Sequence, residues 1–349
     1  MFCPNLIGDT VMATPTLRAL RRGFPNARIV GVIKPSVAAT LDGNPWLDDL
    51  VLFDHKAKDP TRRSWAAIQR LRAERPDLVI LMPNSFRSAL VAFLSGAKHR
   101  VGYARGGRGP LLTHCLKAPL DNRGRFLPVP QVEYYAELAH ALGCPVDSLK
   151  LELALTEADQ LAADRAFFAL GLNDGRPIVC LNTGGAFGPA KNWPTHHFAT
   201  LARRLVTDLD IVVLVVCGPS ERETARAIVH EADTPRVVSL ADQPLSIGLT
   251  KAAVHRSALL ITTDSGPRHF ATALGVPVVT LFGPTHIAWT RTHHPMAVHL
   301  QVRLPCGPCQ RAVCPEKHHR CMTELDPESV FHAATRLLPT RALKAKESA

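Results

Sequence analysis

The sequence predicts an α/β protein of two domains, in which β-α-β units form parallel sheets covered by helices on both faces. Hydrophobic residues alternate between short strand-like runs and longer helix-like runs over nearly the whole chain. Repeated β-α-β units of this kind build parallel sheets. The chain has 349 residues, which is long for a single α/β domain and about right for two. Its hydrophobic content of 46% is enough for two cores.

In the first half, the hydrophobic pattern predicts helices at 15–23, 64–75, 85–94 and 132–142 and strands at 29–33, 50–53 and 78–82. The last of these strands, LVILM, is typical of a buried parallel strand. The region 102–130 is rich in Pro, Gly and Arg and is predicted to be irregular. Residues 5–9 resemble the loop after a first strand although only four residues precede them, so either that strand is shortened or the chain starts too late.

The second half has a more regular pattern. It predicts helices at 157–170, 195–206, 221–232, 246–257 and 266–274 and strands at 178–181, 211–217, 237–240, 259–263 and 278–282. Gly171 is the expected C-cap of the first helix. The junction falls between about 155 and 176, and we divide the chain into domains 1–165 and 166–349.

The chain is basic, with a formal net charge of +11 from 41 Lys and Arg against 30 Asp and Glu. This balance is informative about partners: nucleic acid, an anionic membrane surface or a phosphorylated substrate, besides charge that serves only solubility. Aromatic residues make up only 6%, and no nucleic-acid-binding motif is present. We therefore expect no nucleic-acid partner.

The sequence contains no run of about 18 apolar residues that could span a membrane and no signal-peptide pattern in Met1–Asp9. Its nine cysteines fit a reducing cytosol better than a disulfide framework. We expect a cytoplasmic protein.

Three segments carry candidate chemistry. Asp9 follows Gly8 at a helix entrance, where its carboxylate either takes a proton from a substrate hydroxyl or only caps the helix. The loop 182–194 contains glycines and Lys191 between a strand and a helix, which suits a diphosphate, with a flexible connector as the alternative. The segment 262–269 opens a helix after a strand and either binds an anion or supplies helix caps. Gly283–Thr285 follows the next strand at the same sheet edge.

Four cysteines lie close together near the C-terminus, with two histidines among them: Cys306, Cys309, Cys314 and Cys321, and His318 and His319. This spacing matches no common zinc finger or ribbon, so reduced, locally packed cysteines are favoured over a metal site, and the question stays open.

The residues also carry a family resemblance. The segments 7–9, 81–90, 187–194 and 263–266 resemble the heptosyltransferases of glycosyltransferase family nine, and Pro-Asn-Ser-Phe at 83–86 and Phe-Gly-Pro-Ala-Lys at 187–191 resemble its heptosyltransferase II branch most. The resemblance extends from Asn5 to about Val330. It implies a GT-B fold, with two Rossmann-like domains facing across a cleft, the acceptor in the N-terminal domain and the ADP-sugar in the C-terminal domain.

The resemblance also implies residue roles. On pattern alone, the helix cap is the favoured role of Asp9, but Asp9 matches the family's proposed general base, which reverses that preference. Lys191 matches the family's lysine near the donor diphosphate. Arg268 departs from the family pattern, where an apolar residue is expected. The remaining substrate-binding candidates are Thr183, Gly184, Glu221 (an adenosine-ribose contact), Asp264, Ser265, Gly266 and His269 for the donor, and Asn84, Ser85 and Arg87 in the first half.

The implied reaction is an inverting transfer of L-glycero-D-manno-heptose from ADP-heptose to the inner core of lipopolysaccharide, Kdo2-lipid A bearing heptose, without cofactor or catalytic metal. The basic first half would meet the anionic acceptor and hold the protein to the inner face of the cytoplasmic membrane. Three alternatives remain: another nucleotide sugar, a nucleotide-sugar 2-epimerase, and a non-catalytic protein that binds a nucleotide sugar or lipid A.

Overall fold

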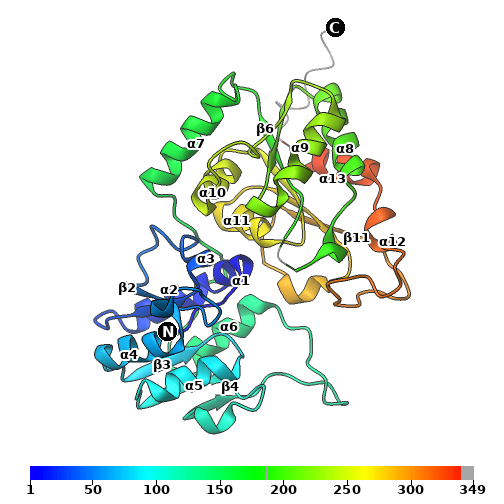
Figure 1. Cartoon of the computed structure of the whole chain (residues 1–349). Coiled ribbons are helices and arrows are strands. Elements are labelled where there is room, and N and C mark those ends of the chain that lie inside the picture. Colours follow the sequence, from blue (N-terminus) through cyan, green and yellow to red (C-terminus); the bar gives the residue numbers. More distant parts are fainter. Residues whose placement is uncertain (186, 339–349) are drawn as a thin grey trace. The chain divides into compact units, whose positions relative to one another are not determined.

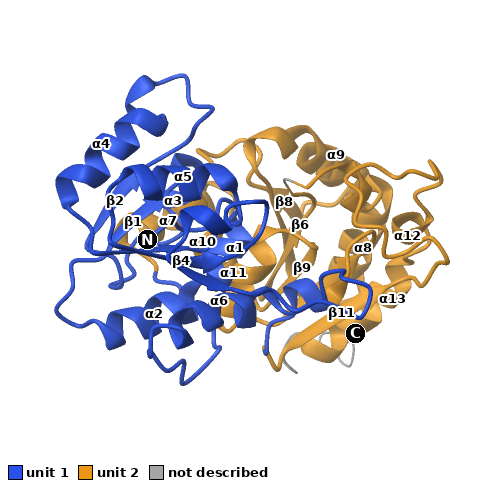
Figure 2. Cartoon of the chain, turned by 90° about the horizontal axis from the view of Figure 1, so that it is seen from below, with its two compact units in different colours: residues 1–154, 288–293 blue, residues 155–287, 294–349 orange. Residues whose placement is uncertain are grey.

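The computed structural model describes residues 1–185 and 187–338. The chain forms two compact units (Figure 2): unit 1 comprises Met1–Ala154 and Ala288–His293, and unit 2 comprises Leu155–Ile287 and the residues from His294 onward. The boundary expected at 165/166 falls inside helix α7 (Glu157–Ala169). That helix begins with a capping box at Thr156 and packs on α10 (Ile247–His255), so the division at 154/155 precedes it.

Unit 2 (Figure 1) is built on a parallel sheet. The sheet has six strands in the order β11-β10-β9-β6-β7-β8. Its strands are β6 (Ile178–Asn182), β7 (Val212–Val216), β8 (Val237–Ser239), β9 (Leu259–Thr263), β10 (Val278–Phe282) and β11 (Ala297–Gln301). Its further helices are α8 (Thr195–Asp208), α9 (Arg222–Ala232), α11 (Gly266–Leu274), α12 (Arg320–Thr323) and α13 (Pro327–Leu337). Short 3-10 turns lie at Pro189–Lys191, Pro219–Glu221 and Ile287–Thr290.

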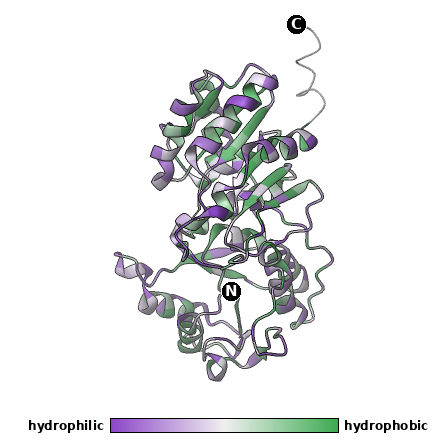
Figure 3. Ribbon diagram, turned by 90° about the vertical axis from the view of Figure 1, so that its right-hand side faces the viewer, coloured by the Kyte–Doolittle hydropathy of each residue, from purple (hydrophilic) through white to green (hydrophobic). Residues whose placement is uncertain are grey.

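Both faces of this sheet are covered, because every residue of β6, β7, β9 and β10 is buried. On one face Val179 and Leu181 belong to the same core as Phe198 of α8. On the other face the thiol of Cys180 approaches the carbonyl oxygen of Ala253 in α10 at 3.7 Å. The strands are accordingly mostly hydrophobic, whereas the helices carry both hydrophilic and hydrophobic residues (Figure 3).

Unit 1 has parallel strands on either side of the chain's first residues. Phe2 bridges in parallel to both Val32 and Leu81, so Met1–Cys3 occupies the place of a first strand. The strands are β1 (Val30–Ile33), β2 (Asp49–Leu52), β3 (Leu78–Leu81), β4 (His99–Tyr103) and β5 (His114–Leu116). The helices are α1 (Ile7–Met12), α2 (Thr14–Gly23), α3 (Pro35–Ala38), α4 (Ser64–Glu74), α5 (Phe86–Leu94) and α6 (Gln131–His140).

The strands and helices predicted from the sequence are present, but the prediction that 102–130 is irregular throughout is wrong. This region contains β5, which pairs with β4 through Val101 and His114. The residues of β5 are exposed or half-buried, so no hydrophobic run marks the strand. Strands β4 and β11 and helices α3, α12 and α13 were also not predicted. Among the described residues, no helix is long and apolar enough to cross a membrane.

Phe198→Ala should destabilise unit 2 strongly, because Phe198 is fully buried and packs edge-on against Trp193, with 4.7 Å between ring centroids. We expect the free energy of unfolding to fall by about 3–5 kcal/mol in urea denaturation followed by circular dichroism. Phe168→Ala on α7 is the matched control, since Phe168 is 81% exposed. Equal effects of the two substitutions would contradict this packing.

Candidate active site

The strand order of unit 2 locates the site. The first strand of unit 2, β6, lies in the middle of the sheet. The strands β7 and β8 follow on one side of it, and β9, β10 and β11 lie on the other. In such doubly wound sheets, ligands bind outside the carboxyl ends of the strands where the order reverses. Here the reversal lies between β6 and β9, so the loops that begin at Thr183 and Asp264 are neighbours.

Asn182, the last residue of β6, ties these two loops together. Its buried side-chain amide lies 2.8 Å from the hydroxyl of Ser265, 3.0 Å from that of Thr262 and 3.1 Å from the carbonyl oxygen of Gly184. Asn182 is the first residue of the glycine-rich segment 182–194, and the sequence predicted no role for it. The available signal was a single amide at the end of an otherwise apolar strand.

The glycine-rich loop packs too closely for side chains. A Cβ atom at Gly185 would lie 2.9 Å from the Cβ of Ser265, and one at Gly184 would collide with the carboxylate of Glu221. Glu221 itself accepts a hydrogen bond of 2.8 Å from the backbone N–H of Gly218. These contacts bring Gly184, Glu221 and Ser265 to one sheet edge, as the donor-site assignment requires.

A charged cluster lies at the same edge. The ammonium group of Lys191 donates to the carboxylate Oδ2 of Asp264 at 2.6 Å and to its carbonyl oxygen at 2.8 Å. Thr285 donates to the same Oδ2 at 2.7 Å, and the guanidinium of Arg268 reaches Oδ1 at 3.1 Å. The ring of Phe187 lies 4.5 Å from the Lys191 nitrogen. Two predicted residues, Lys191 and Asp264, thus form a direct ion pair that the sequence did not predict.

Burial and charge together set the ionisation of this cluster. Burial acts to raise the pKa of Asp264, but the charges of Lys191 and Arg268 outweigh it and hold that pKa below its ordinary value. Burial, followed by the charge of Arg268, lowers the pKa of His269 well below its usual range. The same two causes lower the pKa of His299 in β11 to about 4. Both imidazoles are therefore neutral at pH 7.

Among the residues predicted for the donor site, two have a buried polar side-chain atom without a hydrogen-bond partner in the described part of the chain: the hydroxyl of Thr183 and the Nδ1 atom of His269. Buried polar groups are nearly always paired, so such atoms indicate a place for a polar ligand. Ser265 stands at the N-cap of α11 without a capping side-chain bond. The first turn of that helix, which begins at Gly266, adds the positive end of a helix dipole. The arrangement suits an anion.

Unit 1 has the same topology with a different set of side chains. Its strand order also reverses beside the first segment, between Met1–Cys3 and β3. The residues that follow these two segments include Asp9 and Asn84, so the sheet places both at one edge.

Asp9 does not cap its helix. Leu6 occupies the N-cap of α1, and Asp9 is the third helical residue, so the capping alternative is wrong. The pKa of the Tyr135 phenol on α6 is raised well above its usual value by burial and then by the charge of Asp9. Asp9 therefore acts electrostatically on α6 across the edge of unit 1.

The three other candidates of unit 1 differ in their surroundings. The side chain of Asn84 is held by the buried guanidinium of Arg108 at 3.1 Å and by the hydroxyl of Tyr134 at 3.2 Å. Ser85 caps α5 by accepting from the backbone N–H of Ser88. Arg87 is exposed. Only Asn84 is fixed by its neighbours, and binding roles for all three stay predictions.

The four clustered cysteines line a cavity of about 370 Å³ in unit 2 and are free thiols. Within the described ranges, no group of three or more His, Cys, Asp or Glu side chains is placed to hold a metal ion. This segment instead supports the turn that carries Lys191. The carbonyl of Ala312 accepts from the N–H of Ala190 at 3.0 Å, and His319 bonds the carbonyl of Ala190 at 2.8 Å.

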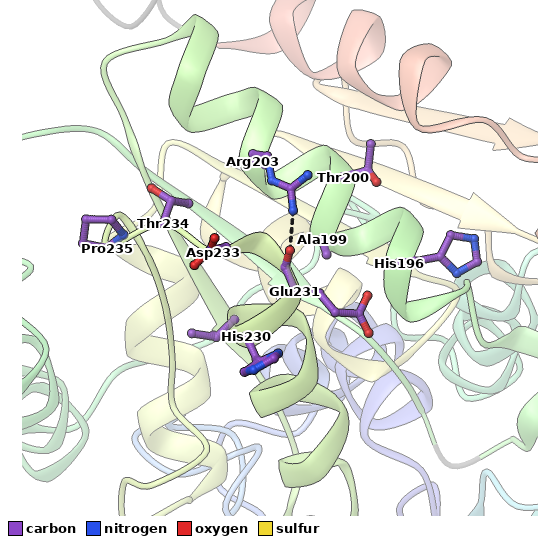
Figure 4. Close-up of a pocket in the computed structure, with 10 residues that line it drawn as sticks. His196, Ala199, Thr200, Arg203, His230, Glu231, Asp233, Thr234 and Pro235 are labelled. Atoms are coloured by element: carbon purple, nitrogen blue, oxygen red, sulfur yellow. Dashed lines mark hydrogen bonds between the residues drawn. The ribbon is translucent and has the colours of Figure 1, made fainter.

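A second pocket of about 820 Å³ lies between α8 and α9 (Figure 4). There the guanidinium of Arg203 donates to the carbonyl oxygens of Glu231 and Ala232 at the end of α9. None of the residues that the sequence singled out lines this pocket. Its polar contacts complete a helix end, so we assign it no chemistry.

Two doubly wound parallel units, one with a cationic cluster at the switch point of its sheet, have the architecture of the GT-B class, to which many glycosyltransferases belong. Comparison with known proteins specifies it further. The model of glycosyltransferase family 9 (heptosyltransferase) matches residues 64–320, and the chain belongs to that family.

Among similar proteins, lipooligosaccharide heptosyltransferase 2 of Campylobacter jejuni is 27% identical over 340 residues, covering 96% of both chains. Lipopolysaccharide heptosyltransferase 2 of Escherichia coli is 27% identical over 347 residues, covering 96% of this chain and 97% of the other. The solved E. coli ADP-heptose lipopolysaccharide heptosyltransferase II superposes with a TM-score of 0.77 at 24% identity, covering 96% and 97% of the two chains. These findings confirm the predicted family and fold.

The two buried histidines predict a pH-dependent stability of unit 2. Their pKa values are lower in the folded protein than in the unfolded chain, where 6.5 applies, so the unfolded chain binds more protons between about pH 4 and 6.5. The free energy of unfolding should therefore fall as the pH falls through this window, by about 1.4 kcal/mol per pH unit for each histidine. In urea denaturation at several pH values, His299→Gln should show a shallower slope than the wild type. Identical slopes for the variant and the wild type would contradict a lowered pKa of His299 in the folded protein.

Proposed function

We propose that this glycosyltransferase is an inverting heptosyltransferase of lipopolysaccharide core assembly, which transfers L-glycero-D-manno-heptose from ADP-heptose to an inner core that already carries heptose. The observation that carries the proposal is the buried cluster of Lys191, Asp264 and Arg268 at the switch point of the unit 2 sheet. The names of the similar proteins point to the same donor and acceptor.

The leaving group of this reaction is a nucleoside diphosphate, which gains negative charge as the bond to the sugar breaks. Lys191 and the N-terminus of α11 are positioned to stabilise that charge. The unpartnered hydroxyl of Thr183 and His269 Nδ1 supply further hydrogen bonds, and Glu221, beside Gly184, suits a ribose hydroxyl.

The acceptor hydroxyl must lose a proton as it attacks. Asp9 is the carboxylate at the switch point of unit 1, and its negative charge acts on Tyr135. In the proposed mechanism, Asp9 takes this proton as general base. The acceptor oxygen attacks the anomeric carbon from the face opposite to the departing ADP, and this attack inverts the anomeric centre. Asn84, held by Arg108 and Tyr134, is the fixed polar group of this edge that would orient the acceptor.

Asp9→Asn should abolish transfer while donor binding survives, because the amide keeps the shape of the side chain but accepts no proton. We expect a loss of about 100- to 10,000-fold in acceptor-dependent ADP release, measured with ADP-heptose and heptose-bearing deep-rough lipopolysaccharide. Lys191→Ala should weaken ADP-heptose binding as well. Asp77→Asn, which changes an exposed carboxylate of the same unit, is the matched control. Full activity of Asp9→Asn would remove Asp9 as base, and ADP release without acceptor would favour the epimerase alternative.

The acceptor is membrane-bound, and we propose that α5 brings unit 1 to an anionic membrane surface. Phe86, Leu90 and Phe93 lie on one side of this helix and are 51%, 37% and 46% exposed. Arg87 is exposed on the same helix, and the guanidinium of Arg100 lies 5.3 Å from the centre of the Phe93 ring. An apolar helix face bordered by arginines is suited to anionic lipid headgroups.

Replacing Phe86 and Phe93 together by Ser should reduce binding to vesicles that contain phosphatidylglycerol by about tenfold or more, since each phenyl group contributes about 1.5–3 kcal/mol when it leaves water. Co-sedimentation with such vesicles and with neutral phosphatidylcholine vesicles measures this. Phe168→Ser removes an exposed phenyl group from unit 2 and is the control. Equal binding of the variant and the wild type would show that α5 does not contact the membrane.

A further inference from the structure

The cationic cluster contains an arginine whose presence the family resemblance does not explain. Arg268 is the third residue of α11, where the family resemblance predicts an apolar residue, and its side chain is 1% exposed. Its guanidinium lies 5.0 Å from the centre of the Phe282 ring and 3.1 Å from Asp264 Oδ1. Burying a guanidinium group costs free energy of folding unless an opposite charge compensates it.

Arg268 and Lys191 share one carboxylate. Lys191 bonds Oδ2 of Asp264 and Arg268 bonds Oδ1, so the two cations occupy different oxygens and do not compete. The neighbouring His269 and His299 are neutral at pH 7, and the negative charge of Glu221 is met by the N–H of Gly218. Two positive charges therefore face one negative charge in the interior of this cluster.

The sharing of Asp264 by two cations determines whether the ammonium group of Lys191 can bind a phosphate. The carboxylate and the carbonyl oxygen of Asp264 take two of the three N–H donors of this ammonium group, so it can place more than one donor on a phosphate only by leaving one of them. Asp264 is only 4% exposed, so without another cation the departure of Lys191 would leave a buried, uncompensated charge. Arg268 already compensates that charge from the other oxygen.

We propose that Arg268 is a positioning residue for the donor: it holds the charge of Asp264 so that Lys191 can turn to the diphosphate of the nucleotide sugar. This inference rests on the proposed function, in which Lys191 receives that diphosphate. Without Arg268, Asp264 and Lys191 form a closed, neutral pair, and the site loses its attraction for an anion.

The first test is the affinity for ADP, measured by isothermal titration calorimetry. Arg268→Met, which keeps the length of the side chain and removes the charge, should weaken ADP binding by about tenfold or more. Arg268→Lys should remain within about threefold of the wild type, because it retains the charge. Lys251→Met is the matched control: Lys251 is a fully buried cation of the same unit, paired with Asp159 at 3.1 Å, and its loss should leave ADP affinity unchanged.

A rescue variant separates this role from a merely structural one. In the Arg268→Met background, Asp264→Asn removes the carboxylate that retains Lys191 and should restore most of the lost ADP affinity. Loss of packing alone would not be repaired by a second substitution in the same cluster. Circular dichroism verifies that each variant is folded, and Arg268→Gln replaces Arg268→Met if the latter does not fold.

The outcomes distinguish the two proposals. A wild type that binds no ADP, or a Lys191→Ala variant that binds it normally, would overturn the donor site itself. If those two proteins behave as proposed, then wild-type ADP affinity in Arg268→Met, or failure of Asp264→Asn to restore binding, would overturn the role of Arg268 alone.

Discussion

The parallel pairing of β6 with β9 is the constraint on which the site of unit 2 depends. It places Asn182 opposite Thr262, so the chain leaves the sheet at two adjacent points although about 80 residues separate them in sequence. Because helices cover both faces of the sheet, polar side chains gather at this edge and at few other places in the interior. The amide of Asn182 then fixes the spacing between the two loops through Ser265 and Gly184.

Burial strengthens the electrostatic interactions of the charges at this edge. Asp264 stays ionised in the interior because Lys191 and Arg268 compensate its charge, whereas burial, and then the charge of Arg268, keeps His269 neutral. In a low dielectric, an excess of positive charge attracts an anion much more strongly than it would at the surface. The exposed arginines of unit 1 also carry positive charge, but water and salt screen them, so they suit a broad anionic surface better than one bound diphosphate.

The two units share a topology but carry different side chains at the equivalent edge of the sheet. In unit 1 the first strand is reduced to the bridging residue Phe2, yet the strand order still reverses beside it and places Asp9 and Asn84 at one edge. In unit 2 the equivalent edge carries cations. A displacement reaction needs both a proton acceptor and charge stabilisation for the leaving group, and in the proposed mechanism these two roles fall to residues of different units.

Much of this could be predicted from the sequence. The alternation of hydrophobic runs predicted five of the six strands of the unit 2 sheet, because strands buried on both faces are mostly apolar. The short motifs indicated Asp9, Lys191 and the loop from Asp264 to Gly266, since these residue types follow strands and open helices. Strand β5 escaped prediction because its residues are largely exposed and its place is fixed by pairing with β4.

The sequence by itself determined which segments carry chemistry, because glycines, a lysine and helix-opening polar residues act locally and leave local patterns. Only the tertiary structure decided which of them act together. The pairing of Lys191 with Asp264, the sharing of that carboxylate by Arg268 and the exclusion of Asp9 from the helix cap all depend on the arrangement of the folded chain. Partners separated by about 73 residues leave no periodic signal, since their contact arises from strand order and burial.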